Sequence, residues 1–293
     1  MTKPKRTAVR FGHWVTARKV VQGTALAVFL LIFLYSRRDE LTPALANVFM
    51  RLDPLAVLVH LFASRTFLAG SALALGVVLL TLLAGRAWCG WLCPLGTILD
   101  LFSLKQWRKN REERTQSWHR LKYVLLAAVL SAALLGNLAL LILDPLTLLY
   151  RTLTTSLYPG LDRAILALEE TLYPIPFLSD LIARFDQWMR PAFLPAQPYT
   201  YRNPMVFAVV FAAVIGLNMA APRFWCRVLC PLGALLGLFS KVALFRRSLI
   251  PGCIECSRCA HTCPTGAVDP LKQFGVRVSE CTLCMECFAV CPA

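Results

Sequence analysis

The sequence contains the run CIECSRCAHTCP at residues 253–264, and the run CTLCMECFAVCP at residues 281–292 repeats its spacing. Eight of the twelve cysteines lie in these two runs, within the last 41 residues. Disulfide-rich chains are typically small and secreted, whereas short, regular cysteine spacing is typical of metal binding. Thiolate ligands favour zinc or iron–sulfur centres. The C-terminal segment is therefore predicted to bind metal.

Both runs have the form CxxCxxCxxxCP, the spacing of bacterial ferredoxins, in which the fourth cysteine of each run binds the cluster of the other run. The prediction is a small ferredoxin-like α+β domain over residues 249–293 with two [4Fe–4S] clusters. One cluster is assigned Cys253, Cys256, Cys259 and Cys291, and the other is assigned Cys281, Cys284, Cys287 and Cys263.

Zinc is the alternative occupant of these cysteines, but structural zinc sites pair two CxxC elements across a longer spacer. The tandem runs of four, each followed by proline, favour iron–sulfur clusters. The first run continues through Thr265 to Val268, whereas the second ends at Pro292-Ala293. This difference suggests a chain truncated at its C-terminus.

The rest of the chain has the composition of a membrane protein, with 57% hydrophobic and 16% charged residues over 293 positions. Ordinary soluble domains carry about 25% charged residues. Residues 20–248 are predicted to form an all-α, internally duplicated membrane domain after a basic N-terminus at 1–19. Four apolar stretches approach the roughly 20 residues that cross a bilayer, namely Val20–Tyr35, Phe67–Gly85, Leu121–Leu143 and Met205–Pro222.

The distribution of charge predicts the orientation. The net charge is +15, and 22 of the 31 Lys and Arg residues fall in segments 1–19, 86–122 and 223–293. Lys and Arg concentrate on the cytoplasmic side of membrane proteins, so both termini are predicted to be cytoplasmic, in a bacterial or archaeal inner membrane. Basic residues that flank apolar runs also argue against a nucleic-acid binder.

Segments 36–66 and 144–204 would then lie outside the membrane. The first contains Leu55, Val57 and Leu61, which predict a partly buried helix. In the second, apolar residues at helical spacing from Leu178 to Met189 predict an interfacial helix that lies on lipid, packs on the spans or binds a partner.

The membrane domain carries a duplicated motif. RAWCGWLCPLGTILDLFS at 86–103 matches RFWCRVLCPLGALLGLFS at 223–240 at 12 of 18 positions, with an offset of 137. Each copy follows a predicted span, so the two copies are expected to be neighbours. Pro94 and Pro231 disfavour the α conformation at the preceding cysteine and are predicted to start new helices.

Three interpretations are open for the motif cysteines Cys89, Cys93, Cys226 and Cys230. They could form a shared metal or third iron–sulfur site, act as redox-active dithiols, or contact the ferredoxin domain. The neighbouring Trp88, Trp91 and Trp225 are interpreted as anchors in the aromatic belt of the membrane interface rather than as an electron relay.

Other cofactors are not indicated. None of the four histidines lies in a predicted span where it could bind haem. His60 could take a proton from a quinol, but a lone surface histidine is the simpler interpretation. No phosphate-binding glycine motif points to a nucleotide.

With its doubled CxxxCP motif, four spans and two ferredoxin runs, the chain resembles the NapH/NosR-like family of membrane polyferredoxins. The resemblance covers almost the whole chain. It implies cluster binding by the eight C-terminal cysteines and electron transfer linked to the quinone pool. The short NapH-like architecture fits better than that of NosR-type members, which carry a large N-terminal periplasmic flavin domain. A second family, the FixG/CcoG-like proteins, also joins membrane spans to ferredoxin clusters, but its members carry a further C-terminal domain outside the cytoplasm.

The sequence thus predicts an electron-transfer subunit of the quinol dehydrogenase type, in contact with lipid, the quinone pool and a redox partner protein. The alternative is an assembly or regulatory protein that uses its clusters to reduce a metal, a thiol or a signalling partner.

Overall fold

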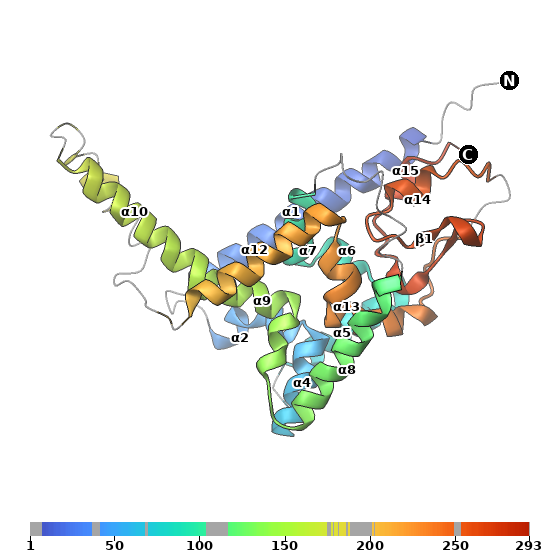
Figure 1. Ribbon diagram of the computed structural model, residues 1–293, viewed down its shortest axis with the longest axis horizontal. Coiled ribbons are helices and arrows are strands. Elements are labelled where there is room, and N and C mark those ends of the chain that lie inside the picture. The colour runs from blue at the N-terminus through green and yellow to red at the C-terminus, as the bar shows by residue number, and fades with distance from the viewer. Residues whose placement is uncertain are drawn as a thin grey trace. The chain divides into compact units, whose positions relative to one another are not determined.

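The computed structural model describes residues 8–36, 42–67, 70–103, 117–174, 177, 179–180, 182–185, 187, 201, 203–248 and 253–292. Within these ranges the chain is mostly helical and divides into two compact units. The first comprises residues 1–147 and 214–293, and the second comprises residues 148–213. The candidate site lies entirely in the first unit (Figure 1).

The first half of the chain begins with one long helix, α1, and continues in shorter helices up to the first copy of the duplicated motif. Their bounds are α1 Ala8–Ser36, α2 Pro43–Ala46, α3 Val48–Arg51, α4 Pro54–Ser64, α5 Ala72–Ala84, α6 Ala87–Trp91 and α7 Pro94–Leu101. The helix expected within 36–66 is present as α4, with Leu55 and Val59 buried.

The second half starts at α8 and ends after the second copy of the motif, where the segment at 225–229 is a π-helix. Its elements are η3 Ser117–Arg120, α8 Leu121–Leu134, η4 Ala139–Leu143, α9 Pro145–Thr152, η5 Leu153–Leu157, α10 Tyr158–Leu172, α12 Pro204–Ala220, η6 Trp225–Leu229, α13 Pro231–Phe239 and η7 Ser240–Val242. Of the predicted interfacial helix near 178–189, residues 179–180, 182–185 and 187 are described and are helical, and the others lie outside the described residues.

The duplication extends beyond the cysteine motif. The tetrapeptide LDPL occurs at 52–55 and again at 143–146, and each copy starts a helix, α4 or α9. Asp53 accepts hydrogen bonds from the amides of Leu55 and Ala56 at 2.8 and 3.3 Å. Such N-caps, with proline at the first helical position, stabilise a helix start. The LDPL tetrapeptide is therefore a second structural repeat.

The third predicted span, 121–143, is not one helix. α8 ends at Leu134, and Gly136 follows with φ +76°. The amide of Asn137 donates to the Ala132 carbonyl at 2.9 Å, and that of Gly136 to Ala133 at 2.9 Å. These bonds form a Schellman cap, which a glycine in the left-handed region permits. The chain then turns back through η4 to Asp144.

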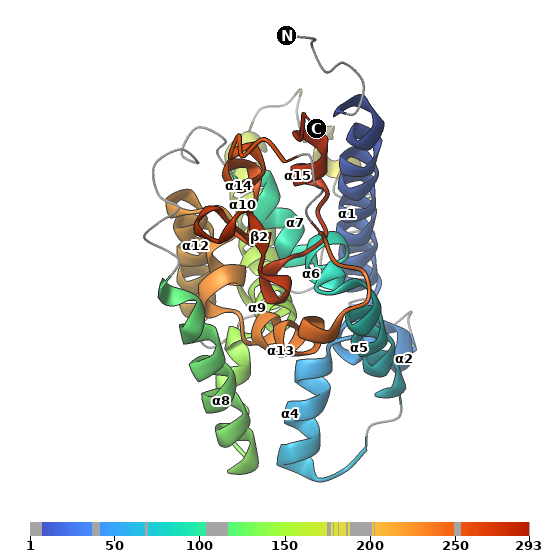
Figure 2. The ribbon, with the colours of Figure 1, turned by 90° about the vertical axis from the view of Figure 1, so that its right-hand side faces the viewer.

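The C-terminal domain contains a two-stranded antiparallel sheet, β1 Val268–Asp269 with β2 Gly275–Val276, and short helices. The helical elements are α14 Arg258–Thr262, η8 Pro270–Lys272, η9 Val278–Glu280 and α15 Glu286–Ala289. Ala260, Val268 and Phe274 form its buried core. α15 packs on α1 (Figure 2). η9 packs on α13 and η7.

The two cysteine runs adopt the same local conformation. Glu255 and Ser257 of the first run have φ of 53° and 57°, and the equivalent Leu283 and Met285 have φ of 47° and 61°. Non-glycine residues with positive φ are uncommon and mark backbone held by its surroundings. Here they wrap each CxxCxxC loop back on itself.

One described helix, Gly12–Ser36, is long and apolar enough to cross a membrane. Shorter apolar helices occur at 54–64, 72–84, 204–219 and 231–242. Large apolar side chains nevertheless point outward along α5, where Leu75, Leu79 and Leu83 are exposed.

Candidate iron–sulfur centre

One cavity in the C-terminal domain is lined by the thiols assigned to the second cluster. Its walls include Cys263, Cys281, Cys284 and Cys287, together with Arg247 and Phe288. Cys263 comes from the first run and the other three from the second, as the crossed ligand assignment requires. Four thiolates around one cavity are the donor set of a [4Fe–4S] cluster, so these residues fit that group.

Hydrogen bonds to sulfur accompany this cavity. The Cys263 Sγ accepts from the Ala267 amide at 3.2 Å. Amide bonds to cluster sulfurs tune reduction potential. Burial raises the pKa of Cys284 and of Cys287 to about 12. Each thiol would therefore be protonated at neutral pH unless metal binding displaces its proton.

The cysteines assigned to the other cluster are more accessible. Cys253 and Cys256 are exposed, and Cys259 and Cys291 are half-buried. Among the four ligands of the second cluster, Cys284 is buried and the rest are half-buried. The first-run loop thus forms the solvent-facing end of the domain.

The duplicated motif has the local structure that its prolines predict. Cys93 (φ −68°, ψ 117°) and Cys230 (φ −71°, ψ 111°) are extended, and Pro94 and Pro231 start α7 and α13. The Gly233 amide donates to the Cys230 Sγ at 3.2 Å, whereas the Cys93 side chain makes no capping hydrogen bond at the start of α7. Each thiol therefore sits at the positive end of a helix, where negative charge is stabilised.

The structure brings the four motif thiols together in one buried region. Burial and the proximity of Cys89 and Cys226 raise the pKa of Cys93 well above its ordinary value. Burial and the same pair of neighbours likewise raise the pKa of Cys230. The pKa of Cys226 rises to about 11, chiefly through burial. Buried thiols with raised pKa are poor nucleophiles, which disfavours the dithiol interpretation.

No group of three or more His, Cys, Asp or Glu side chains within the described ranges is arranged to hold a single metal ion. In a cubane, by contrast, each thiolate binds a different iron. Whether these four thiols hold a cluster stays a prediction.

The two motif copies are linked by a reciprocal exchange of arginines. Arg86 of the first copy donates to the Cys226 carbonyl at 3.3 Å, and Arg223 of the second copy donates to the Cys89 carbonyl at 3.3 Å. Both guanidinium groups are 1% exposed. Each therefore places a positive charge beside the thiols of the other copy, which would stabilise anionic ligands there.

The counter-charges of these arginines differ, and the difference positions the ferredoxin domain. Arg223 binds Asp100 through Nε at 2.8 Å and Nη2 at 2.6 Å. The residue equivalent to Asp100 in the second copy is Gly237, where a Cβ would lie 3.1 Å from the Ser279 carbonyl oxygen. Glu280 of the ferredoxin domain instead binds Arg86, Nη1 to Oε2 at 3.0 Å. The ferredoxin domain thus supplies the carboxylate that the second copy lacks.

A second asymmetry acts at the same contact. Gly90 lies so close to the ferredoxin domain that a Cβ there would be 2.3 Å from the Thr282 carbonyl oxygen. The equivalent residue of the other copy is Arg227, whose guanidinium lies against Gly266. Trp91 also donates to the Leu283 carbonyl at 3.1 Å. The second cysteine run therefore packs directly on the duplicated motif.

The tryptophans do not have the predicted role as membrane-interface anchors. Trp88 and Trp225 are buried inside the protein at 4% and 5% exposure, and Trp91 is half-buried and bonded to the ferredoxin domain. A tryptophan beside an apolar run is typical of the membrane interface. Here the packing of the two motif copies buries the rings instead. Among the described residues, the Nε1 groups of Trp88 and Trp225 have no hydrogen-bond partner.

Residues that sequence reasoning missed complete the site. Glu280 accepts from Lys122 Nζ at 2.5 and 2.6 Å, and His119 lies 4.0 Å away. Burial opposes ionisation, but the charges of Arg86 and Lys122 lower the pKa of Glu280. Only Arg86 carried a sequence signal, as an invariant position of the two motif copies.

Comparison with known proteins agrees with this geometry. A family described as a 4Fe-4S binding domain matches residues 66–114 and 203–250, which contain the two motif copies. Protein NirI of Paracoccus denitrificans is 32% identical over 235 residues, 76% of this chain and 27% of NirI. The ferredoxin-type protein NapH of Escherichia coli is 26% identical over 304 residues, 96% of this chain and 88% of NapH.

The methylamine utilization ferredoxin-type protein MauN of Methylorubrum extorquens is 26% identical over 275 residues, 87% of this chain and 76% of MauN. The aligned region spans 27% of NirI and 54% of YccM from Escherichia coli. No solved structure matches the chain.

Crossed cysteine runs on a duplicated 4Fe-4S motif define an iron–sulfur electron-transfer protein. Within that class, the similarity to NirI, NapH and MauN supports the resemblance to the NapH/NosR-like polyferredoxin family that the sequence predicted. The family matches fall on the CxxxCP copies rather than on the C-terminal runs.

Proposed function

We propose that this protein is a multi-pass membrane subunit that passes single electrons between the quinone pool, or a cytoplasmic donor, and a redox partner protein. The observation that carries the proposal is the contact between residues 280–283 and the duplicated motif. It joins a ferredoxin-type domain to the apolar helices through a buried ion pair and a hydrogen bond from Trp91.

Exposed apolar side chains support a place in the membrane. Besides α5, the helix α12 exposes Met205, Val206 and Val209, and α8 exposes Val124 and Leu134. Contiguous exposed apolar surface on soluble proteins is limited, whereas lipid covers it in membrane proteins. In the proposed topology a reporter fused at position 109 is cytoplasmic and one at position 169 is external; the reverse result would contradict the charge argument.

The two cysteine runs of the C-terminal domain differ in their surroundings, and this difference indicates which run faces the helical domain. When bound, [4Fe–4S] clusters supply one-electron transfer at a potential that the surrounding charges set. Cys281, Cys284 and Cys287 belong to the loop against the motif, and Cys253 and Cys256 face solvent. We assign the exposed first-run loop to the redox partner and the second run to the membrane side.

The test is anaerobic mixing of the purified protein, in lipid nanodiscs, with a reduced quinol analogue. Cluster reduction would bleach the visible absorbance and produce EPR signals. Reduction by dithionite without quinol, which should bleach the same absorbance, serves as the control for cluster integrity. Intact clusters that respond to dithionite but to neither ubiquinol nor menaquinol analogues would overturn the quinol role.

A further inference from the structure

Two buried carboxyl groups face each other where the LDPL tetrapeptides meet. Asp53, the N-cap of α4, and Asp144, which precedes α9, are both 0% exposed. Their carboxyl groups lie within hydrogen-bonding reach of each other. Although the two residues are 91 positions apart, they are equivalent members of the repeat.

Each carboxyl group uses one oxygen for its own helix. Asp53 Oδ1 accepts from Leu55 and Ala56, and Asp144 Oδ2 accepts from the amides of Leu146 and Thr147 at 3.1 and 2.9 Å. The other oxygens, Asp53 Oδ2 and Asp144 Oδ1, are buried and have no donor among the described residues. Two buried acceptors are therefore left facing each other.

Among the described residues, no cation forms an ion pair with either carboxyl group. α4 packs on α8, α5, α13 and α3. α5 and α13 have no ionisable side chain within their bounds. α8 contributes Lys122 and Tyr123, and Lys122 is bonded to Glu280. The remaining ionisable groups of these elements are Arg51 on α3, His60 on α4, Tyr150 and Arg151 on α9, and Cys230, the N-cap of α13.

Two ionised carboxylates cannot share such a place without a large cost, because burial removes solvent and like charges repel. Burial and the charge of Asp144 raise the pKa of Asp53 well above its ordinary value, and burial raises the pKa of Asp144. A proton between the two orphan oxygens converts an unpaired contact into a strong, charge-assisted hydrogen bond.

We propose that Asp53 and Asp144 form a buried proton-binding site in which their two carboxyl groups hold one shared proton.

A bound cation is the less suitable occupant. Hard cations take six or more oxygen ligands, and here each carboxyl group has only one oxygen free. The amides at the N-termini of α4 and α9 also point at the pair, and that end of a helix favours negative charge and disfavours a cation.

The test is infrared spectroscopy of the holoprotein in nanodiscs at neutral pH. The wild type is expected to show a carboxylic-acid C=O band that shifts in D2O. Asp53→Asn and Asp144→Asn should each abolish it, because the new amide donates to the remaining carboxylate and replaces the proton. Asp162→Asn, at a buried carboxyl group on α10, should leave it unchanged.

A missing band at neutral pH would overturn the proton site, as would a band that survives in both single variants or that sodium displaces. If a variant fails to fold, titration of the wild-type band against pH gives the same decision. Clusters that fail to respond to quinol would overturn the proposed function without affecting this band.

Discussion

Glu280 of the ferredoxin domain and Lys122 of α8 form a buried ion pair, with Nζ 2.5 Å from Oε1, although 158 residues separate them in sequence. Lys122 is 0% exposed and Glu280 3%. Because Arg86 shares the same carboxylate, the single negative charge of Glu280, the residue before the second cysteine run, lies between two buried cations of the helical domain. This relationship fixes where the ferredoxin domain docks.

Replacing Glu280 by Gln should destabilise the docked state by about 3–5 kcal/mol, because Lys122 and Arg86 would be left buried without their counter-charge. Thermal unfolding and the rate of proteolysis near residue 250 would measure the change. Glu255→Gln, at an exposed position of the equivalent loop, is the matched control. Equal behaviour of the two variants would show that the ion pair does not hold the domain.

The same pair predicts an acid limit for docking. The pKa of Glu280 is lowered from 4.5, since the cations outweigh the opposing effect of burial. A carboxyl group with a lowered folded-state pKa contributes stability above its unfolded pKa and loses it as pH falls through the folded value. The wild type should therefore lose stability below about pH 4.5, and the Glu280→Gln variant should lose this part of the pH dependence in equilibrium unfolding.

Gly90 should be intolerant of a side chain. Alanine there would place its Cβ 2.3 Å from the Thr282 carbonyl oxygen and push the second cysteine run away from the motif. At Gly76 on α5 a Cβ meets nothing within 4 Å, and helical Gly→Ala commonly stabilises by roughly 0.5–1 kcal/mol. We expect Gly90→Ala to slow cluster reduction by quinol and to lower the unfolding temperature, while Gly76→Ala does neither. Normal reduction in Gly90→Ala would contradict the assigned contact.

How much of this could be read from the sequence depends on the range of each interaction. Cysteine spacing and the proline after each fourth cysteine are local signals, and Cys93 and Cys230 are extended as Pro94 and Pro231 predict. The end of α8 was also encoded locally, at Gly136-Asn137, but the apolar residues beyond it concealed the break.

The long-range contacts had no comparable signal. Glu280 stands in the sequence as an ordinary charge before Cys281, and only the fold shows that it substitutes for the carboxylate absent at Gly237. The LDPL repeat escaped because its offset of 91 differs from the 137 of the cysteine motif. The segment between the LDPL tetrapeptide and the motif is longer in the second copy than in the first.

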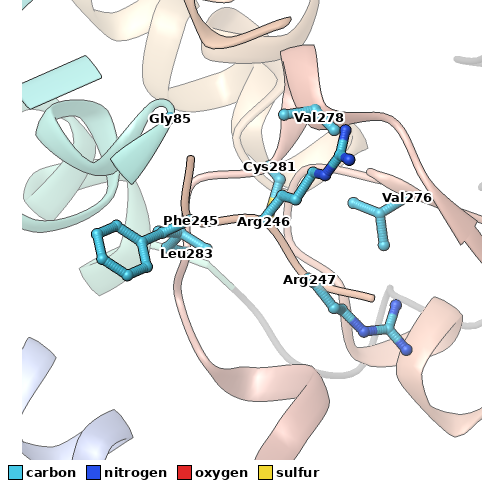
Figure 3. Close-up of a pocket in the computed structure, with 8 residues that line it drawn as sticks. All are labelled: Gly85, Phe245, Arg246, Arg247, Val276, Val278, Cys281 and Leu283. Carbon is cyan, nitrogen blue, oxygen red and sulfur yellow. The ribbon is translucent and has the colours of Figure 1, made fainter. Parts of the chain in front are cut away.

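Arg247 should tune the second cluster. It lines the small pocket beside Cys281, as Figure 3 shows together with Arg246. The charge of Arg247, but not that of Arg246, is among the main influences that lower the pKa of Cys281 and Cys287 against burial. Because a reduced cluster carries one more negative charge, Arg247→Gln should make its potential more negative by roughly tens of millivolts. Redox titration followed by EPR would measure this, and an equal shift in Arg246→Gln would show that the effect is not specific.

The iron content decides the role of the motif thiols. Two cubanes give about eight irons per chain, and a third bound by Cys89, Cys93, Cys226 and Cys230 would give about twelve. If the third cluster exists, Cys226→Ser should reduce about twelve to about eight, because the buried thiol cannot be replaced from solvent. Cys284→Ser should also remove about four irons, but from the ferredoxin domain, so Mössbauer or EPR spectra of the two variants should differ. Eight irons in an anaerobic wild-type preparation, unchanged in Cys226→Ser, would exclude the third cluster and leave the motif as a docking surface whose buried arginines hold the second cysteine run in place.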